Sequence, residues 1–334
     1  MKPILRQHNL LALLAASCVG MAFAADLPVS RTGGSITVSL PVNQTTLLSL
    51  PLVEIVASGT VALTGGGNTI ELASLPASLP DVLTNPHAIK ITSRDNQAGG
   101  STNAYGLTAL ITAQATQTVT AALLAKPNAG DEFIIYRLET FNSLFGATNT
   151  VGLKGGSSVT SADIIYTDNG AGSLVGYFFR TGVSAWRLVS APAGANQNPT
   201  ILPNRGLLVV RKTGGNPVDI SFSGDAMIGK EVVDVTNSAS NIINNPFSLP
   251  TTLLDSRLKD FVTGGSSVAS ADIVYLESAG TLTGYFYRTG VNQWRLVSAP
   301  TGADQGTRVI TPGKALLVVK RATGEFTLEE PFAE

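Results

Sequence analysis

Aromatic and arginine residues that recur in two stretches of the chain are the best candidates for a binding site. They are Tyr177, Arg180, Trp186 and Arg187, and then Tyr285, Arg288, Trp294 and Arg295. Flat aromatic rings stack on sugar rings, and two such platforms on one chain would bind a polysaccharide with avidity. The alternative is that both tryptophans are core residues, which the arginines cover through cation–π contacts. We favour this alternative, because the single Trp of a small domain is a natural core anchor.

Alternation along the predicted strands shows which of these side chains share a face. In the strand that ends at Arg180, Tyr177 and Phe179 point to one face and Arg180 to the other. If a hairpin through Thr181-Gly182 joins this strand to the next, Trp186 pairs with an aromatic residue. Arg187 then lies on the face of Arg180.

The chain offers little for catalysis. A Ser-His-Asp system needs a histidine, and a zinc site needs several His or Cys ligands. Once the predicted leader is removed, His87 is the one residue of these two types that remains. We expect His87 to be a partly exposed residue at the start of a strand. The sequence therefore predicts no catalytic residue, no metal site, no cofactor and no enzyme.

Carboxylates leave two weaker possibilities. Asp163 and Asp272 are duplicated acids, and a pair of acids facing each other across a groove could hydrolyse a glycosidic bond. Asp168-Asn169-Gly170 and Asp95-Asn96 could supply oxygen ligands to calcium, although such sequences are first of all typical of turns.

A long internal duplication organises the second half of the chain. The segment Trp186–Pro192, WRLVSAP, returns unchanged as Trp294–Pro300, and GGSSV at Gly155 returns at Gly264. The spacing of about 109 residues exceeds the period of roughly 20–50 residues found in solenoids. It indicates a duplicated domain.

Short runs rich in β-formers, separated by Gly-rich turns, predict an all-β protein of tandem β-sandwich or small-barrel domains. One hairpin is expected around Gly65-Gly66-Gly67-Asn68. We divide the chain into a signal peptide (1–24), an N-terminal β domain (25–140), a first β repeat (141–226) and a second β repeat (227–334).

The first 24 residues have the features of a secretory signal: Lys2 and Arg6, an apolar core, and Ala22-Phe23-Ala24 before the cleavage site. We therefore expect an exported protein in the periplasm, at the cell surface or outside the cell. Acylation of Cys18, as in a lipoprotein, is a minor alternative. No later stretch is long and apolar enough for a membrane helix.

Charge argues against one class of partner. Two of the 22 basic residues lie in the leader, so 20 remain against 23 acidic residues, a net charge near −3. Nucleic-acid binding requires clustered Lys and Arg, so we expect no nucleic-acid partner.

Several blocks carry a resemblance to a known group. They are HAIKITS from His87, YGLTALITAQATQTVTAALL from Tyr105, GDEFIIYRLETFNSLFG from Gly130, and ADIIY, GYFFRTG, WRLVSAP and ILPNRGLLVVRK in the first repeat. Together they resemble uncharacterised secreted β-repeat proteins best known from verrucomicrobial bacteria. The repeats are also similar to β-modules of surface proteins from gliding bacteria, which Asn-Pro-Phe opens as at Asn245. The resemblance implies export and a β-fold, and it implies no activity.

These observations predict a secreted, non-enzymatic surface or matrix protein that acts by assembly or adhesion. The alternative is a carbohydrate-binding protein that uses the duplicated Trp/Tyr platforms. The expected partners are the protein itself or an extracellular polysaccharide.

Overall fold

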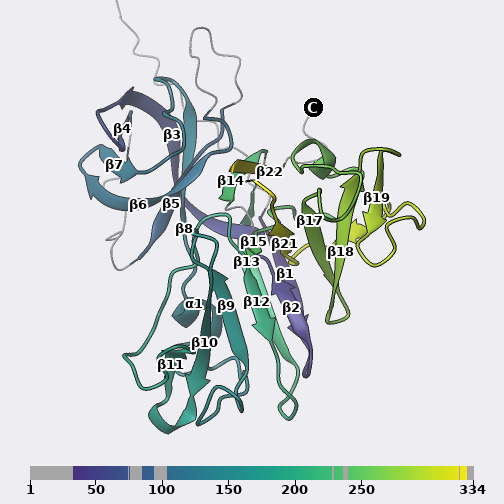
Figure 1. Ribbon diagram of the computed structural model, residues 1–334. Coiled ribbons are helices and arrows are strands. Elements are labelled where there is room, and N and C mark those ends of the chain that lie inside the picture. Colours follow the sequence, from purple (N-terminus) through teal and green to yellow (C-terminus); the bar gives the residue numbers. More distant parts are fainter. Residues whose placement is uncertain are drawn as a thin grey trace, which may run out of the picture. The chain divides into compact units, whose positions relative to one another are not determined.

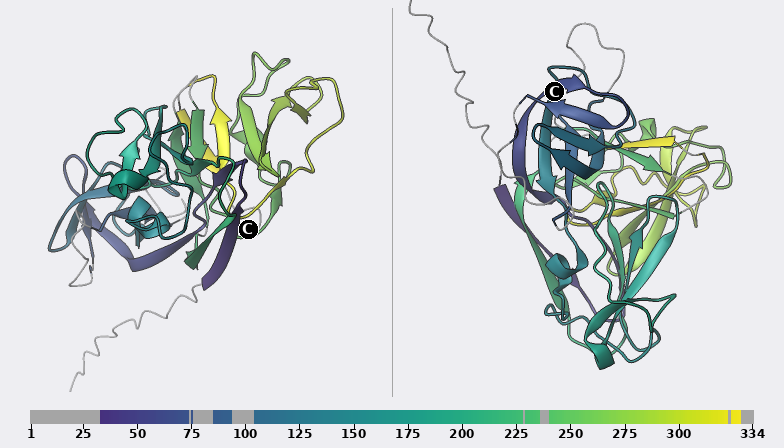
Figure 2. Two further views of the ribbon diagram at one scale, coloured as in Figure 1. Left: turned by 90° about the horizontal axis from the view of Figure 1, so that it is seen from below. Right: turned by 90° about the vertical axis from the view of Figure 1, so that its left-hand side faces the viewer.

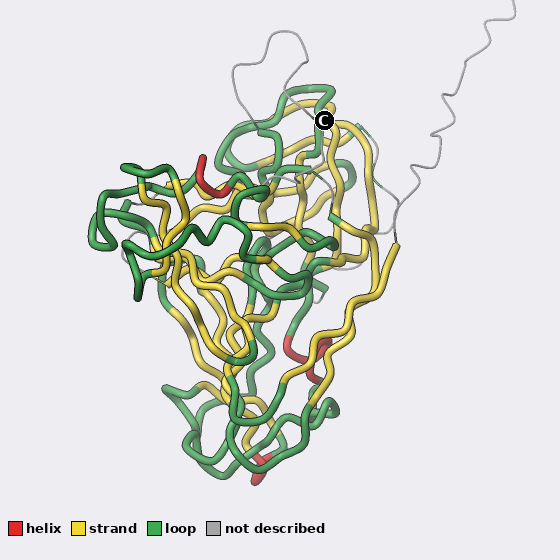
Figure 3. The backbone as a smooth tube through the Cα atoms, turned by 90° about the vertical axis from the view of Figure 1, so that its right-hand side faces the viewer, coloured by secondary structure: helices red, strands yellow, loops and turns green. Residues whose placement is uncertain are grey.

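The computed structural model describes residues 33–73, 75, 85–93, 104–227, 229–235, 240–322 and 324–328 (Figure 1). The predicted signal peptide with Cys18, and Asp95-Asn96, lie outside these described residues. Strands make up 48% of the structure and helices 4%, which confirms the all-β prediction (Figure 3). Within the described ranges, no helix is long and apolar enough to cross a membrane.

Six antiparallel strands close into a small barrel, because the first strand of the ring also pairs with the last. In ring order they are β3 (Leu52–Thr64), β4 (Thr69–Leu72), β7 (Thr118–Ala121), β6 (Thr108–Ala115), β5 (His87–Ile91) and β8 (Glu132–Arg137). β3 and β4 form the expected hairpin at the Gly-rich turn, with Val61 opposite Leu72. Alternate side chains such as Ile70, Ile89 and Phe133 fill the interior.

The first repeat is built around a five-stranded antiparallel sheet. In sheet order its strands are β11 (Ala185–Leu188), β10 (Leu174–Arg180), β9 (Ile164–Asp168), β12 (Leu207–Val210) and β2 (Thr45–Leu48). Two further strands, β1 (Gly33–Leu40) and β13 (Val218–Ala226), pair with each other, and β13 continues onto β3. The short helices are α1 (Phe141–Phe145) and the 3₁₀ turn η1 (Thr181–Val183).

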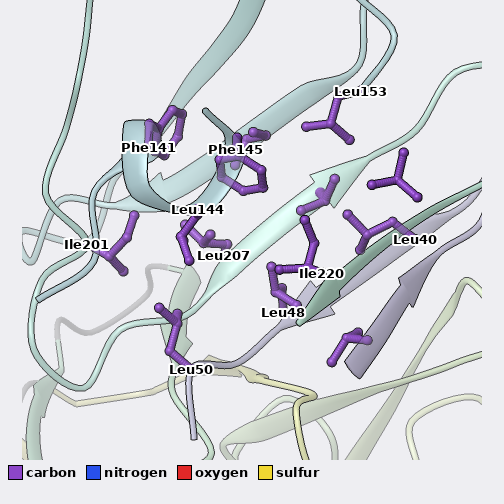
Figure 4. Close-up of a cluster of buried hydrophobic side chains, with 14 of the residues drawn as sticks. Leu40, Leu48, Leu50, Phe141, Leu144, Phe145, Leu153, Ile201, Leu207 and Ile220 are labelled. Atoms are coloured by element: carbon purple, nitrogen blue, oxygen red, sulfur yellow. The ribbon is translucent and has the colours of Figure 1, made fainter. Parts of the chain in front are cut away.

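The core of the first repeat combines side chains from the two strands before the barrel with side chains from the elements after it (Figure 4). Leu40 and Leu48 come from β1 and β2, whereas Phe141 and Phe145 come from α1 and Leu207 comes from β12. Thr140 is the N-cap of α1, and its hydroxyl accepts a hydrogen bond from the Ser143 amide at 3.2 Å. This cap satisfies one of the free amides of the first turn.

The second repeat reproduces the five-stranded sheet and its flanking strand pair in the same order. In sheet order its strands are β15 (Ser240–Ile243), β21 (Leu316–Val319), β17 (Ile273–Ser278), β18 (Thr281–Arg288) and β19 (Gln293–Leu296). Two separate strand pairs accompany the sheet: β14 (Glu231–Val235) with β22 (Gly324–Leu328), and β16 (Thr251–Thr252) with β20 (Val309–Ile310). The repeat also contains the 3₁₀ turn η2 (Leu258–Asp260). β15 pairs with β21 as β2 pairs with β12. Likewise, β14 pairs with β22 as β1 pairs with β13.

The duplication therefore extends upstream of the segments that match in sequence. β1 and β2 complete the first repeat, and the barrel is inserted between β2 and α1. The predicted boundary at residue 140 differs from this arrangement, because it separates strands that the structure joins in one sheet and one core.

The two repeats contact each other reciprocally, as two subunits do across a two-fold axis. The Gly206 amide donates to the Ile242 carbonyl at 3.0 Å, and the Ala315 amide donates to the Leu47 carbonyl at 3.2 Å. Gly206 and Ala315 hold equivalent positions directly before β12 and β21, and Leu47 and Ile242 hold equivalent positions in β2 and β15. The outer edges of β2 and β15 are therefore covered by the opposite repeat.

Ion pairs flank this contact at equivalent positions. Arg205 and Asp168 form a buried pair at 3.1 Å in the first repeat, and Lys314 and Glu277 pair at 2.5 Å in the second. The same Asp168 carboxylate accepts the amide of Ile242 at 3.1 Å, so it links the two repeats directly.

The barrel is fastened to the second repeat by a buried charge pair. Lys90 on β5, with no exposed surface, bonds to Glu231 on β14. Burial raises the pKa of the Glu231 carboxyl, although Lys90 opposes this effect. The backbone continues the contact, since the Val232 amide donates to the Gly106 carbonyl at 3.0 Å.

Candidate functional site

The candidate residues lie on two equivalent hairpins. In the first, Trp186 stands opposite Phe179, with ring centroids 5.4 Å apart, and Arg187 stands opposite Phe178. In the second, Trp294 stands opposite Tyr287 at 5.7 Å. The predicted pairing of Trp186 with an aromatic residue is confirmed, and Trp294 repeats it.

The two indoles are buried, each with 1% of its surface exposed. Trp186 packs edge-on against Phe141 and close to Phe145 of α1. The neighbouring Tyr177 and Tyr285 are buried as well, and burial raises the pKa of the Tyr177 hydroxyl. A stacking platform needs an open ring face, which these side chains do not offer. The structure places them in the cores of the two repeats.

The two indole N–H groups have different surroundings. Trp186 Nε1 donates to the Gly146 carbonyl at 2.9 Å, just beyond the end of α1. None of the described residues accepts a hydrogen bond from Trp294 Nε1. The first repeat continues from the Thr140 cap into α1, whereas the second forms a turn at the equivalent Thr252, whose hydroxyl accepts the Asp255 amide at 3.1 Å.

Three of the four candidate arginines bond to carbonyls of loops. Arg180 and Arg288 each donate from Nη1 to a proline carbonyl, of Pro192 and Pro300 respectively, at 3.1 Å in both repeats. Arg187 donates to the Gly194 carbonyl in the same loop. In the second repeat, Arg295 bonds instead to the side chain of Gln293. Arg180, Arg187 and Arg288 thus fix the loops that follow each hairpin, and Arg295 bonds within β19.

The duplicated acids are bonded inside their own repeats. Asp163 accepts the amides of Lys154 and Lys212 at 2.7 Å and Nε of Arg211 at 2.6 Å. The carboxylate is buried, so these charge-assisted bonds replace the water that it lost on folding.

Asp272 repeats this arrangement. It accepts the amides of Thr263 and Arg321 and pairs with Lys320 Nζ at 2.9 Å. Each acid has its own cation and its own backbone donors, so the two do not form the facing pair that glycoside hydrolysis uses.

His87 differs from its prediction, because it is completely buried. It opens β5, which pairs with β6 on one side and β8 on the other, so the wall of the barrel closes around it. Burial lowers the pKa of the His87 ring.

The possible calcium ligands of the Asp168 turn are engaged elsewhere. One Asp168 oxygen accepts the Gly170 amide at 2.7 Å, and the other faces Arg205. Asn169 caps the turn through the Ala171 amide at 2.9 Å. Among the residues that the structure describes, no three His, Cys, Asp or Glu side chains are grouped as metal ligands.

A shallow groove of about 590 Å³ lies elsewhere, on the segment Pro250–Asp260 of the second repeat. Leu254, Arg257 and Lys259 line it, and none of the eight candidate residues does. Sequence reasoning missed three features: this groove, the buried Lys90–Glu231 pair and the outer edge of β1. A lysine within a strand of apolar neighbours, His87–Ile91, was the one available signal for the buried pair.

No protein-family model, curated protein or solved structure matches this chain. Its function is therefore inferred from its own geometry.

Proposed function

We propose that this protein is an exported, non-enzymatic component of the cell surface or extracellular matrix that acts by assembly or adhesion. One observation carries the proposal: the side chains retained in both repeats are engaged within the fold. The tryptophans fill the cores, the arginines bond to loop carbonyls or to a neighbouring side chain, and Asp163 and Asp272 are bonded to backbone amides and cations. The residues shared by the two repeats thus maintain the fold of each repeat. This supports a function that depends on the surfaces and strand edges of the repeats.

The sequence supports the same proposal from two sides. The secretory features of the first 24 residues favour export. The low charge of the chain, with 13% charged residues, would not oppose association between copies. Edge strands of β-domains join readily when nothing repels them.

Sugar binding through the duplicated platforms has less support, because both indoles are buried. Binding of a polysaccharide at another surface would be detected by a pull-down on insoluble polysaccharides.

Sedimentation velocity over a wide concentration range, combined with a pull-down on insoluble polysaccharides, tests the proposal. We expect reversible self-association that grows with concentration and no retention on the polymers. A chain that stays monomeric at every concentration and is retained by one polysaccharide would contradict assembly and favour carbohydrate binding. A chain that is monomeric and retained by nothing would contradict assembly as well.

A further inference from the structure

β1 is an open edge of the sheet. It is eight residues long, and among the described strands only β13 pairs with it. Its register is continuous from Gly33 opposite Asp225 to Leu40 opposite Val218, without a bulge. About half of its amide and carbonyl groups therefore point away from β13, where they can form hydrogen bonds with another strand. The right-hand view of Figure 2 shows β1, in purple, at the side of its sheet.

Three other outer strands, β11, β19 and β22, carry protections that edges of soluble proteins commonly have. β11 and β19 have four residues each and carry Arg187 and Arg295. A loop covers each of them, since the Gln197 and Gln305 amides donate to the carbonyls of Trp186 and Trp294. β22 is short and exposes Glu325.

From Gly33 to Ser39, β1 has none of these protections, whereas at its end Arg211 Nη1 donates to the Leu40 carbonyl at 2.7 Å. Its sequence, GGSITVSL, contains no charged residue and no proline. Ser35, Thr37 and Ser39 are exposed on one face, and Thr37 Oγ1 bonds to Ser221 Oγ at 2.9 Å. Val38 and Leu40 belong to the core on the other face, with Ile36 packed against it.

This pattern is complementary to itself. When two antiparallel copies of β1 lie side by side, their polar side chains share one face of the joined sheet only in certain registers. Odd-numbered residues must pair with odd-numbered ones and even with even, because a slip of one residue inverts the faces. A pairing centred on Thr37 places Ile36 opposite Val38 of the other copy and Ser35 opposite Ser39. It keeps seven of the eight residues in the ladder and brings no like charges together.

We propose that β1 pairs with β1 of a second copy of this chain, antiparallel about a two-fold axis at Thr37. The two sheets then join in the order β13, β1, β1 and β13. This inference rests on the proposed function and names its partner and its surface.

A cysteine scan tests the pairing. Cys18 is the only cysteine, so Cys18→Ser leaves a chain into which one cysteine can be introduced. Thr37→Cys would place two thiols directly opposite each other, with Cα atoms about 4.5–5.5 Å apart, which suits a disulfide. Ser221→Cys is the matched control, since Ser221 lies on the same face one strand further in. Three strand spacings, about 14 Å, would separate the two Ser221 positions, and a disulfide cannot span that distance.

We expect Thr37→Cys to form a disulfide-linked dimer on mild oxidation, whereas Ser221→Cys stays monomeric. Denaturing electrophoresis under non-reducing conditions separates the two forms. Circular dichroism checks that both variants fold. Self-association without a Thr37 cross-link would overturn the β1 pairing and leave assembly through another surface. Absence of any self-association by sedimentation would overturn both the pairing and the proposed function.

Discussion

The two tryptophans provide a matched pair for measuring what one hydrogen bond contributes. Trp186→Phe and Trp294→Phe remove the same atoms from sites that are equally buried, so the cavity and transfer costs are similar in the two repeats. They differ in the indole N–H, which reaches the Gly146 carbonyl in the first repeat and has no acceptor among the described residues in the second.

The size of the difference follows from these contacts. Trp186→Phe loses a hydrogen bond that contributes about 1 kcal/mol. Trp294→Phe removes an unpaired buried donor, whose desolvation already costs the folded state about 1 kcal/mol or more. We therefore expect Trp186→Phe to lower the free energy of unfolding by about 2 kcal/mol more than Trp294→Phe.

Urea unfolding followed by circular dichroism measures this difference. The chain has only two tryptophans, so the fluorescence of each variant reports the repeat that was left unchanged. Because the repeats share reciprocal contacts, both signals should change at the same urea concentration. Equal losses in the two variants, or a larger loss for Trp294→Phe, would refute the reasoning from the Gly146 bond. Losses near zero in both would contradict burial of the indoles.

Three further predictions concern buried ionisable groups. Asp272→Asn should cost about 3 kcal/mol or more in urea unfolding, whereas Asp260→Asn, in an exposed pair, should cost less than about 1 kcal/mol; similar costs would contradict this contrast. Since burial lowers the pKa of His87, its contribution to stability is complete above the unfolded value of about 6.5 and is lost as the pH falls below it, so His87→Gln should flatten the fall in Tm between neutral and mildly acid pH; an unchanged slope would exclude His87 as its cause. Glu231→Gln should cost about 3–5 kcal/mol, and adding Lys90→Met should recover most of the loss in a double-mutant cycle; additive losses would contradict coupling.

Sequence patterns predicted local structure better than they predicted neighbours in space. Alternation and the turn at Thr181-Gly182 were sufficient to pair Trp186 with an aromatic residue. The same alternation cannot tell a core face from an exposed aromatic face, because both repeat every second residue. Burial of Trp186 depends on α1 and on Gly146, which lies 40 residues earlier in the chain.

The organisation of the first repeat was hidden for a related reason. β1 and β2 share strand character with β14 and β15, but their sequences do not match visibly, and the inserted barrel separates them from the rest of their sheet. His87 follows a proline at the start of a strand, which indicated exposure. Closure of the barrel by β8 buries it, and closure is a long-range property.

Hydrogen–deuterium exchange at low and high protein concentration tests the central claim most directly. If the protein assembles through its open edge, amides of residues 33–40 that face away from β13 should exchange quickly in the dilute protein and become protected as the concentration rises. Exchange in β11 and β19 should stay the same. Exchange of β1 that is independent of concentration, or new protection confined to another surface, would contradict assembly through this edge.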